Sequence, residues 1–191
     1  MKIYIDFDRT LFNTDLFIKD LNIIKEKYHI SEELFQKYSL IFHEKQGFNP
    51  LDILKNMEKE VSIDKRIYND IEELFLHDKK YLYDDVIDFL KKAKKKYYKI
   101  ILFTRGNYAF QIKKIQNTAI LDFFDDVLIT LKHKGELNLD YDTSIFIDDN
   151  IIELESIMTR NPKRIIQIQR DSSEIINNNF EIVYSLKDII I

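Results

Sequence analysis

The chain has 191 residues, of which 45% are hydrophobic and 32% are charged, so its length and composition suit one domain, with or without an inserted lobe, and argue against disorder. It has no cysteine, which excludes disulfides, thiolate metal sites and cysteine nucleophiles. Because the net charge is −4 and no apolar run approaches membrane-spanning length, we expect a cytoplasmic protein without a nucleic-acid or membrane partner.

The chain opens with a strand predicted at 2–6, whose apolar residues lead to two aspartates, Asp6 and Asp8. Residues two apart on a strand point to the same face, so the two carboxylates should lie close together. Neighbouring carboxylates repel each other unless a cation or a shared proton lies between them. The pair therefore favours a site for a hard divalent cation with oxygen ligands.

Residues 13–83 have no strand signal, and we predict an inserted lobe of about four helices. Apolar residues recur at helical spacing in 17–28 and again in 67–75. Ser31 and Asn49 each precede residues that suit the first turn of a helix. This lobe interrupts an otherwise regular α/β pattern.

The remainder of the chain alternates strands and helices, which is typical of an α/β fold with a parallel sheet. Strands are predicted at 99–104, 126–130, 144–148 and 164–168, with a weaker one at 181–184. Helices are predicted at about 84–96, 108–121 and 151–159, and Ser185 should cap a final turn. We therefore expect a Rossmann-like parallel sheet flanked by helices, formed by 1–12 and 84–191, with 13–83 inserted.

Polar side chains follow three later strands, as the acidic pair follows the first. They are Thr104 with Arg105, then Lys132 and Lys134, then Asp148 and Asp149. Ligands of open parallel sheets bind outside the carboxyl ends of the strands, so we expect these groups to converge. Carboxylates suit Mg²⁺, whereas hydroxyl and ammonium groups suit phosphate oxygens. With only three glycines there is no Gly-rich phosphate loop, so a phosphoryl-transfer site here must use side chains.

Four of these motifs, in this order, make the chain resemble the haloacid dehalogenase-like (HAD) hydrolase superfamily. They are Asp6-Phe7-Asp8-Arg9-Thr10, Thr104, a lysine near 132–134, and Asp148-Asp149. The resemblance covers nearly the whole chain, because 13–83 stand where many HAD phosphatases carry a helical cap. It implies a HAD-like catalytic core and a Mg²⁺-dependent phosphatase that acts on a small phosphorylated metabolite.

The resemblance also implies which residues hold the metal and carry the reaction. Asp6 would be a metal ligand and the nucleophile that forms an aspartyl-phosphate. Asp8 would be the general acid and base, and its backbone carbonyl would contact the metal. Asp148, with Asp149, would complete the metal site. Because the dehalogenase branch lacks an aspartate at the position of Asp8, phosphate chemistry is favoured.

For the phosphate, the resemblance implies that Thr104, with Arg105 beside it, binds the transferring group and that a lysine neutralises it. Both Lys132 and Lys134 are candidates, and we slightly favour Lys132. Two features depart from the family pattern. Arg9 stands where the family most often has glycine, and the segment between 130 and 148 is short.

Three other functions are weighed against hydrolysis. A phosphomutase of the same superfamily would return the phosphoryl group to its substrate. A phospho-acceptor signalling module is disfavoured, because its acidic pair and acceptor aspartate come in a different order and without a helical insertion. A non-catalytic phosphate-binding relative is disfavoured by the intact Asp6 and Asp8. No residue of 13–83 carries a readable code for the substrate, and the oligomeric state is equally open.

Overall fold

The computed structural model describes residues 1–76, 78–96, 98–170 and 179–191, leaving aside the side chains of residues 43, 44, 78 and 79. Contacts between residues divide the chain into two compact units. The first, which we call the sheet unit, consists of Met1–Asn13, Leu82–Arg105 and Ile120–Ile191. The second, the helical unit, consists of Thr14–Tyr81 and Gly106–Ala119.

A parallel sheet of six strands forms the centre of the sheet unit, counted over the described residues, in the order β3-β2-β1-β4-β5-β6. The strands are β1 (Lys2–Ile5), β2 (Lys99–Arg105), β3 (Asp126–Thr130), β4 (Ser144–Asp148), β5 (Arg164–Ile168) and β6 (Glu181–Val183). Each strand lies within one residue of its predicted range, and the predicted Rossmann-like fold class is confirmed. The strand order reverses between β1 and β4, where sheets of this kind bind their ligands.

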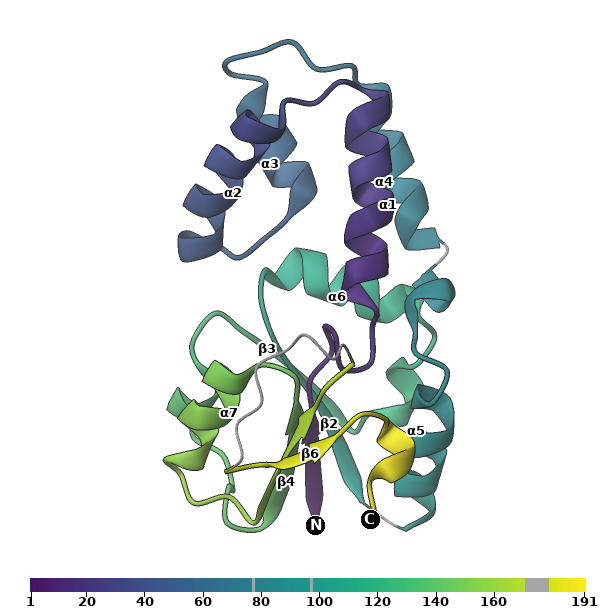
Figure 1. Cartoon of the computed structure of the whole chain (residues 1–191), viewed down its shortest axis with the longest axis vertical. Coiled ribbons are helices and arrows are strands. Elements are labelled where there is room, and N and C mark those ends of the chain that lie inside the picture. Colours follow the sequence, from purple (N-terminus) through teal and green to yellow (C-terminus); the bar gives the residue numbers. More distant parts are fainter. Residues whose placement is uncertain (77, 97, 171–178) are drawn as a thin grey trace. The chain divides into compact units, whose positions relative to one another are not determined.

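Two helices cover the sheet, α5 (Val86–Lys95) on one face and α7 (Ile151–Met158) on the other (Figure 1). The predicted boundaries of both helices are confirmed to within about two residues. The amide of the Asn150 side chain starts α7, because its Oδ1 accepts a hydrogen bond of 2.9 Å from the Ile152 amide. The described part of the unit also has three short 3₁₀ turns: η2 (Leu121–Phe123), η3 (Lys134–Glu136) and η4 (Leu186–Asp188). The predicted cap at Ser185 is confirmed, since its side chain starts η4.

An aromatic cluster fills the α7 face of the sheet. Tyr4 and Tyr141 both stack on Phe146, with ring centres 4.8 and 5.3 Å from its own. Phe103 meets Tyr4 edge to face at 5.8 Å. Because side chains alternate along a strand, Asp6 follows Tyr4 on this face. Asp148 follows Phe146 in the same way, so the two carboxylates reach the same side of the sheet.

The helical unit consists of most of the predicted insertion together with one later helix. Its elements are α1 (Thr14–Lys27), α2 (Glu32–Lys45), α3 (Pro50–Met57), α4 (Arg66–Leu76), η1 (Asp78–Tyr81) and α6 (Tyr108–Asn117). Both predicted caps are confirmed. Ser31 Oγ accepts from the Leu34 amide at 3.3 Å, and Asn49 Oδ1 accepts from the Leu51 amide at 3.2 Å.

Helix α6 packs with the helical unit, although the sequence-based division places it with 84–191. The ring of Phe110 meets the rings of Phe48 and Phe75 at 5.6 and 5.8 Å, and so belongs to the aromatic core of that unit. The helix ends at Asn117 instead of the predicted residue 121. Ala119 has φ +57°, which a continuing α-helix does not allow.

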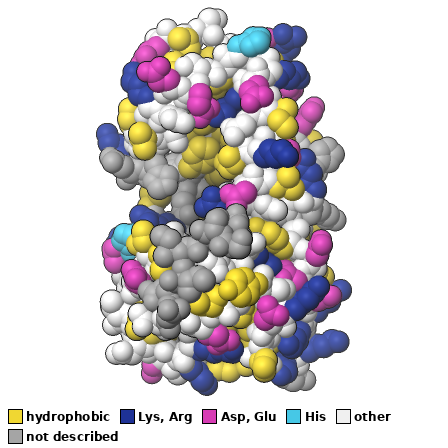
Figure 2. All heavy atoms as spheres, viewed as in Figure 1, with side chains coloured by type: hydrophobic (Ala, Val, Ile, Leu, Met, Phe, Trp, Pro, Cys, Tyr) yellow, Lys and Arg dark blue, Asp and Glu magenta, His cyan; other side chains and the backbone are white. Residues whose placement is uncertain are grey.

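On the face of the molecule shown in Figure 2, acidic and basic side chains are interspersed. Charged side chains at the surface of the sheet unit form ion pairs, such as Lys2 with Asp140 at 2.6 Å and Arg164 with Glu181 at 2.6 Å. This mixed pattern is typical of a solvated surface. Among the described residues, no helix combines the length and apolar character needed to cross a membrane.

Candidate functional site

Three charged side chains meet at the carboxyl ends of β1 and β4. Lys134 Nζ donates to Asp6 Oδ1 at 2.6 Å and to Asp148 Oδ2 at 2.5 Å. Asp6 follows β1, Asp148 ends β4, and the Asp6 amide donates to the Ile147 carbonyl at 2.9 Å. All three side chains are buried. The cluster therefore lies at the point where the strand order reverses, as the sequence predicts for Asp6 and Asp148.

Burial and mutual repulsion perturb the acidity of this cluster. Burial raises the pKa of Asp6 to about 7, although the ammonium group of Lys134 opposes the rise. The negative charges of Asp148 and Asp8 raise it further. Burial also raises the pKa of Asp148. Burial alone would lower the pKa of Lys134, but the two carboxylates outweigh it and raise that pKa, so the lysine is a fixed cation.

A third carboxylate completes a candidate cation site. Asp6, Asp148 and Asp149 each offer an oxygen, and these oxygens all lie within 4.8 Å of one another. Carboxylate oxygens are the ligands that Mg²⁺ and Ca²⁺ prefer in proteins. The donor set therefore fits a hard divalent cation, and these three aspartates are the residues that would hold it.

The backbone of Lys134 is fixed on both sides, whereas Lys132 lies outside the cluster. The Lys134 amide donates to Glu153 Oε2 at 2.8 Å, and its carbonyl accepts from Tyr141 Oη at 2.7 Å. Its ammonium group lies 5.3 Å from the centre of the Phe103 ring. The side chain of Lys132 is exposed. The geometry thus favours the lysine that the sequence analysis ranked second.

Glu153 is a buried acid of α7 that the sequence analysis did not single out. Its Oε1 accepts from Arg105 Nη1 at 2.8 Å and lies 2.9 Å from His133 Nδ1. Burial would raise the pKa of Glu153, but the Lys134 amide, His133 and Arg105 together lower it. In the sequence, an acid in the first turn of a helix reads as an ordinary partner of the helix dipole. That Glu153 also binds the Lys134 amide follows only from the tertiary structure, which places the loop carrying Lys134 beside α7.

Gly135 holds that loop against α7. A Cβ atom at this position would lie 2.1 Å from the Ser156 carbonyl oxygen. We expect Gly135→Ala to lower the free energy of unfolding by about 1–3 kcal/mol, because the backbone must move to accept the methyl group. Urea denaturation would measure the loss, with the exposed neighbour Glu136→Ala as control. An unchanged midpoint for Gly135→Ala would contradict the close approach.

The loop after Asp6 carries the other predicted acid. Asp8 is partly buried, and its charge acts on Asp6 as described above. Arg9, which replaces the family's usual glycine, has φ +52°. This left-handed conformation is the one that glycine adopts most easily, so Arg9 adopts it at the cost of some backbone strain.

Thr104 and Arg105 are the last two residues of β2, and their side chains differ in burial and in hydrogen bonding. Thr104 is 1% exposed, and its Oγ1 has no hydrogen-bond partner among the described residues. Buried hydroxyls are normally bonded, so this one is an available donor for a ligand. The Arg105 side chain is 39% exposed, is bonded to Glu153 and donates to the Leu131 carbonyl at 3.0 Å.

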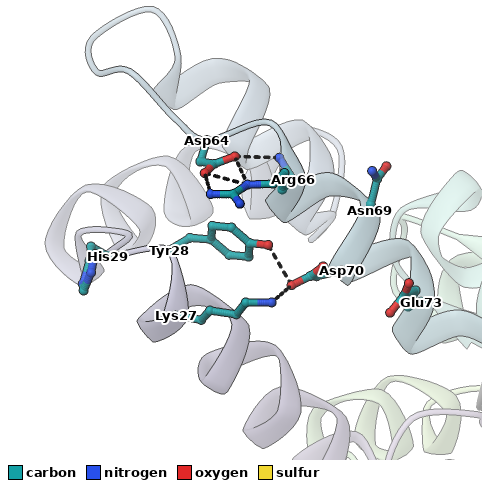
Figure 3. Close-up of a pocket in the computed structure, with 8 residues that line it drawn as sticks. All are labelled: Lys27, Tyr28, His29, Asp64, Arg66, Asn69, Asp70 and Glu73. Atoms are coloured by element: carbon teal, nitrogen blue, oxygen red, sulfur yellow. Dashed lines mark hydrogen bonds and ion pairs between the residues drawn. The ribbon is translucent and has the colours of Figure 1, made fainter.

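The helical unit contains a separate open cavity of about 720 Å³, formed by residues of α1 and α4 and their connections (Figure 3). Asp70 accepts from Lys27 Nζ at 2.6 Å and from Tyr28 Oη at 2.9 Å. Arg66 pairs with Asp64 through its own side chain. Both aspartates of this cavity are thus paired within it, and its lining residues do not bring several carboxylates around a buried cation as the residues beside β1 and β4 do.

Comparison with solved structures shows that the fold is shared with several hydrolases. A structure reported as a haloacid dehalogenase-like hydrolase from Burkholderia xenovorans is 16% identical, with a TM-score of 0.76, covering 97% of this chain and 93% of the other. A HAD phosphatase from Thermococcus onnurineus is 18% identical, with a TM-score of 0.69 and coverage of 98% and 95%. L-2-haloacid dehalogenase from Xanthobacter autotrophicus is 11% identical, with a TM-score of 0.67 and coverage of 98% and 95%.

Comparison with curated proteins gave no match. A family profile described as haloacid dehalogenase-like hydrolase matches residues 5–156, which is most of the chain and contains Asp6, Lys134 and Asp148. The sheet order, the motifs at the strand ends and this match agree with one another. The chain belongs to the haloacid dehalogenase-like hydrolase family.

Proposed function

We propose that the protein is a Mg²⁺-dependent phosphohydrolase that removes phosphate from a small phosphorylated metabolite through an aspartyl-phosphate on Asp6. In this proposal, 1–12 and 84–191 form the catalytic core, and 13–83 form the cap that selects the substrate. The observation that carries it is the double ion pair of Lys134 with Asp6 and Asp148, next to the third carboxylate of Asp149.

The first step would transfer the phosphoryl group to the protein. An oxygen of Asp6 attacks phosphorus, and the bond from phosphorus to the leaving oxygen breaks. Asp8 gives its proton to that leaving oxygen. The ammonium group of Lys134 offsets the negative charge of the transferring group, and the Thr104 hydroxyl donates to one of its oxygens.

The second step would release phosphate. Asp8, now ionised, takes a proton from a water molecule, whose oxygen attacks the phosphorus held by Asp6. The bond between phosphorus and the Asp6 oxygen then breaks, which frees inorganic phosphate and restores both carboxyl groups. When bound, Mg²⁺ would neutralise charge on the phosphoryl oxygens and on the aspartates that hold it.

Cation binding is testable without a substrate. We expect Mg²⁺ to raise the melting temperature, since a ligand at 100 times its Kd adds about 2.7 kcal/mol to the free energy of unfolding. Asp148→Asn should reduce this effect strongly because it removes one ligand. The exposed carboxylate of Asp142 provides the control, and Asp142→Asn should keep the full shift. A shift that survives in Asp148→Asn would place the cation elsewhere.

The reaction itself is tested by three parallel assays on the purified protein. We expect release of inorganic phosphate from p-nitrophenyl phosphate and from some members of a phosphometabolite panel, and dependence on Mg²⁺. Formation of a phosphate isomer without net release would instead identify a phosphomutase. Release of halide from a 2-haloacid without any phosphatase activity would reject phosphate chemistry.

A further inference from the structure

A second buried ion pair lies in the sheet unit, apart from the carboxylate cluster. Arg170, which follows β5, binds Asp85 through two hydrogen bonds of 2.6 and 2.9 Å. The side chains of the two residues are only 8% and 6% exposed. Asp85 precedes α5 and also accepts from Ser185 Oγ at 2.6 Å and from the Leu186 amide at 2.8 Å. The pair thus joins β5, α5 and the C-terminal turn.

Arg170 also holds the loop that carries Asp8. Its Nη2 and Nε donate to the Thr10 carbonyl at 2.7 and 3.2 Å. Its guanidinium carbon lies 4.1 Å from the centre of the Tyr83 ring, and the Tyr83 amide donates to the Leu11 carbonyl at 3.1 Å. Arg170 and Tyr83 therefore hold two successive carbonyls of this loop.

The loop of residues 7–12 contains a strained backbone conformation, which other contacts must stabilise. It contains the left-handed Arg9, and the amides of Leu11 and Phe12 both donate to the Phe7 carbonyl at 2.9 Å. A non-glycine residue in this conformation costs about 1–2 kcal/mol and persists only where its surroundings hold it. The Thr10 carbonyl bound by Arg170 lies directly after Arg9 in the chain.

A contribution to the free energy of unfolding is a weak explanation for the buried pair of Arg170 and Asp85. Burying two charges costs several kcal/mol, and well-packed apolar residues often replace a buried ion pair without loss of stability. A guanidinium group, in contrast, fixes its partners geometrically through several donors in one plane. Arg170 uses these donors to bind the Asp85 carboxylate and the Thr10 carbonyl of the loop.

We propose that Arg170, oriented by Asp85, is a positioning residue that fixes the 7–12 loop and so the place of Asp8 relative to Asp6. This inference rests on the proposed function, because it assigns Asp8 the proton transfers. A displacement of about 1 Å in a reacting group can lower a rate by about 10²-fold. Among the residues that the structure describes, the hydrogen bonds of the Arg170 side chain go to Asp85 and the Thr10 carbonyl and not to Asp6 or Asp148.

The test compares Arg170→Met with Arg164→Met. Arg164 also lies on the β5 segment and pairs with Glu181, but at the surface, so it is a matched control. With p-nitrophenyl phosphate and Mg²⁺, we expect Arg170→Met to lower kcat by about 10-fold to 10²-fold with little change in KM. Arg170→Lys, which keeps the charge and part of the bonding, should recover some of the loss, and Arg164→Met should resemble the parent protein.

Hydrogen exchange provides a second measurement that needs no activity. In Arg170→Met, the amides of Leu11 and Phe12 should exchange faster, while those of β4 should not. If the parent protein releases no phosphate, the proposed function fails, and exchange alone decides whether Arg170 holds the loop. Parent-like kcat and parent-like exchange in a folded Arg170→Met would overturn the proposal.

A second variant distinguishes a loss of positioning from a failure of Arg170→Met to fold. Arg170→Met combined with Asp85→Asn removes both charges and keeps an oxygen for Ser185 and the Leu186 amide. Circular dichroism would establish whether each variant is folded. We expect the double variant to be folded, with low kcat and fast loop exchange. If both variants fail to fold, the pair is a stability element, and the positioning role is rejected.

Discussion

Asp6→Asn is expected to abolish turnover, with a loss of at least about 10³-fold in kcat, while the fold stays intact. Asparagine has nearly the same size and keeps an oxygen that can accept from Lys134, so the packing of the cluster is preserved. It lacks the carboxylate that attacks phosphorus. Phosphate release from p-nitrophenyl phosphate measures the loss, and circular dichroism with thermal melting establishes the fold.

Acid quenching during turnover would identify the intermediate directly. Mass spectrometry should find phosphate on the peptide that contains Asp6 in the parent protein and none in Asp6→Asn. The exposed Asp142→Asn serves as the matched control and should retain both activity and the modified peptide. Substantial activity in Asp6→Asn would exclude this residue as the nucleophile.

Lys134→Met is expected to lower both activity and stability. Loss of the ammonium group leaves two buried carboxylates facing each other without a cation. Removal of one partner of a buried ion pair lowers the free energy of unfolding by about 3–5 kcal/mol. It also removes the cation that offsets charge on the phosphoryl group, for which we expect a fall in kcat of about 10²–10³-fold. Urea unfolding and phosphate release would be measured on the same preparation.

Lys132→Met is the control. Lys132 lies two residues before Lys134 and is exposed, so this variant removes the same charge from the surface. Its free energy of unfolding should change by no more than about 0.5 kcal/mol. Saturating Mg²⁺ should restore part of the stability of Lys134→Met, since a cation can replace the ammonium group between the carboxylates. If Lys132→Met lost activity and Lys134→Met did not, the proposed role of Lys134 would be wrong.

The fold and the positions of the acidic residues were predictable because their signals are local. Alternation of apolar residues defines the strands, and the polar residue at each strand end is visible in the sequence as the point where that alternation stops. Caps such as Ser31, Asn49 and Ser185 act on amides two or three residues away, so they too can be found without tertiary information. Asp6 and Asp148 then follow from the rule that parallel strands end at one edge.

The choice between the two lysines was not predictable in the same way. Lys132 and Lys134 lie two and four residues after the end of β3, and the short segment that carries them has no periodic pattern that would distinguish them. The choice depends on Gly135, which approaches Ser156 of α7 closely, and on Glu153, which binds the Lys134 amide. Both contacts join segments about twenty residues apart in sequence, and neither residue has a distinctive local signal.

The sequence by itself therefore determined the parallel sheet, the helical insertion and the acidic strand ends, because these depend on periodicity and on groups a few residues apart. Tertiary structure alone decided that α6 packs with the insertion, that Lys134 joins Asp6 to Asp148, and that Arg170 binds Asp85 and the Thr10 carbonyl. These contacts bring together segments distant in the chain, and such contacts form only when packing places their side chains within a few ångströms of one another.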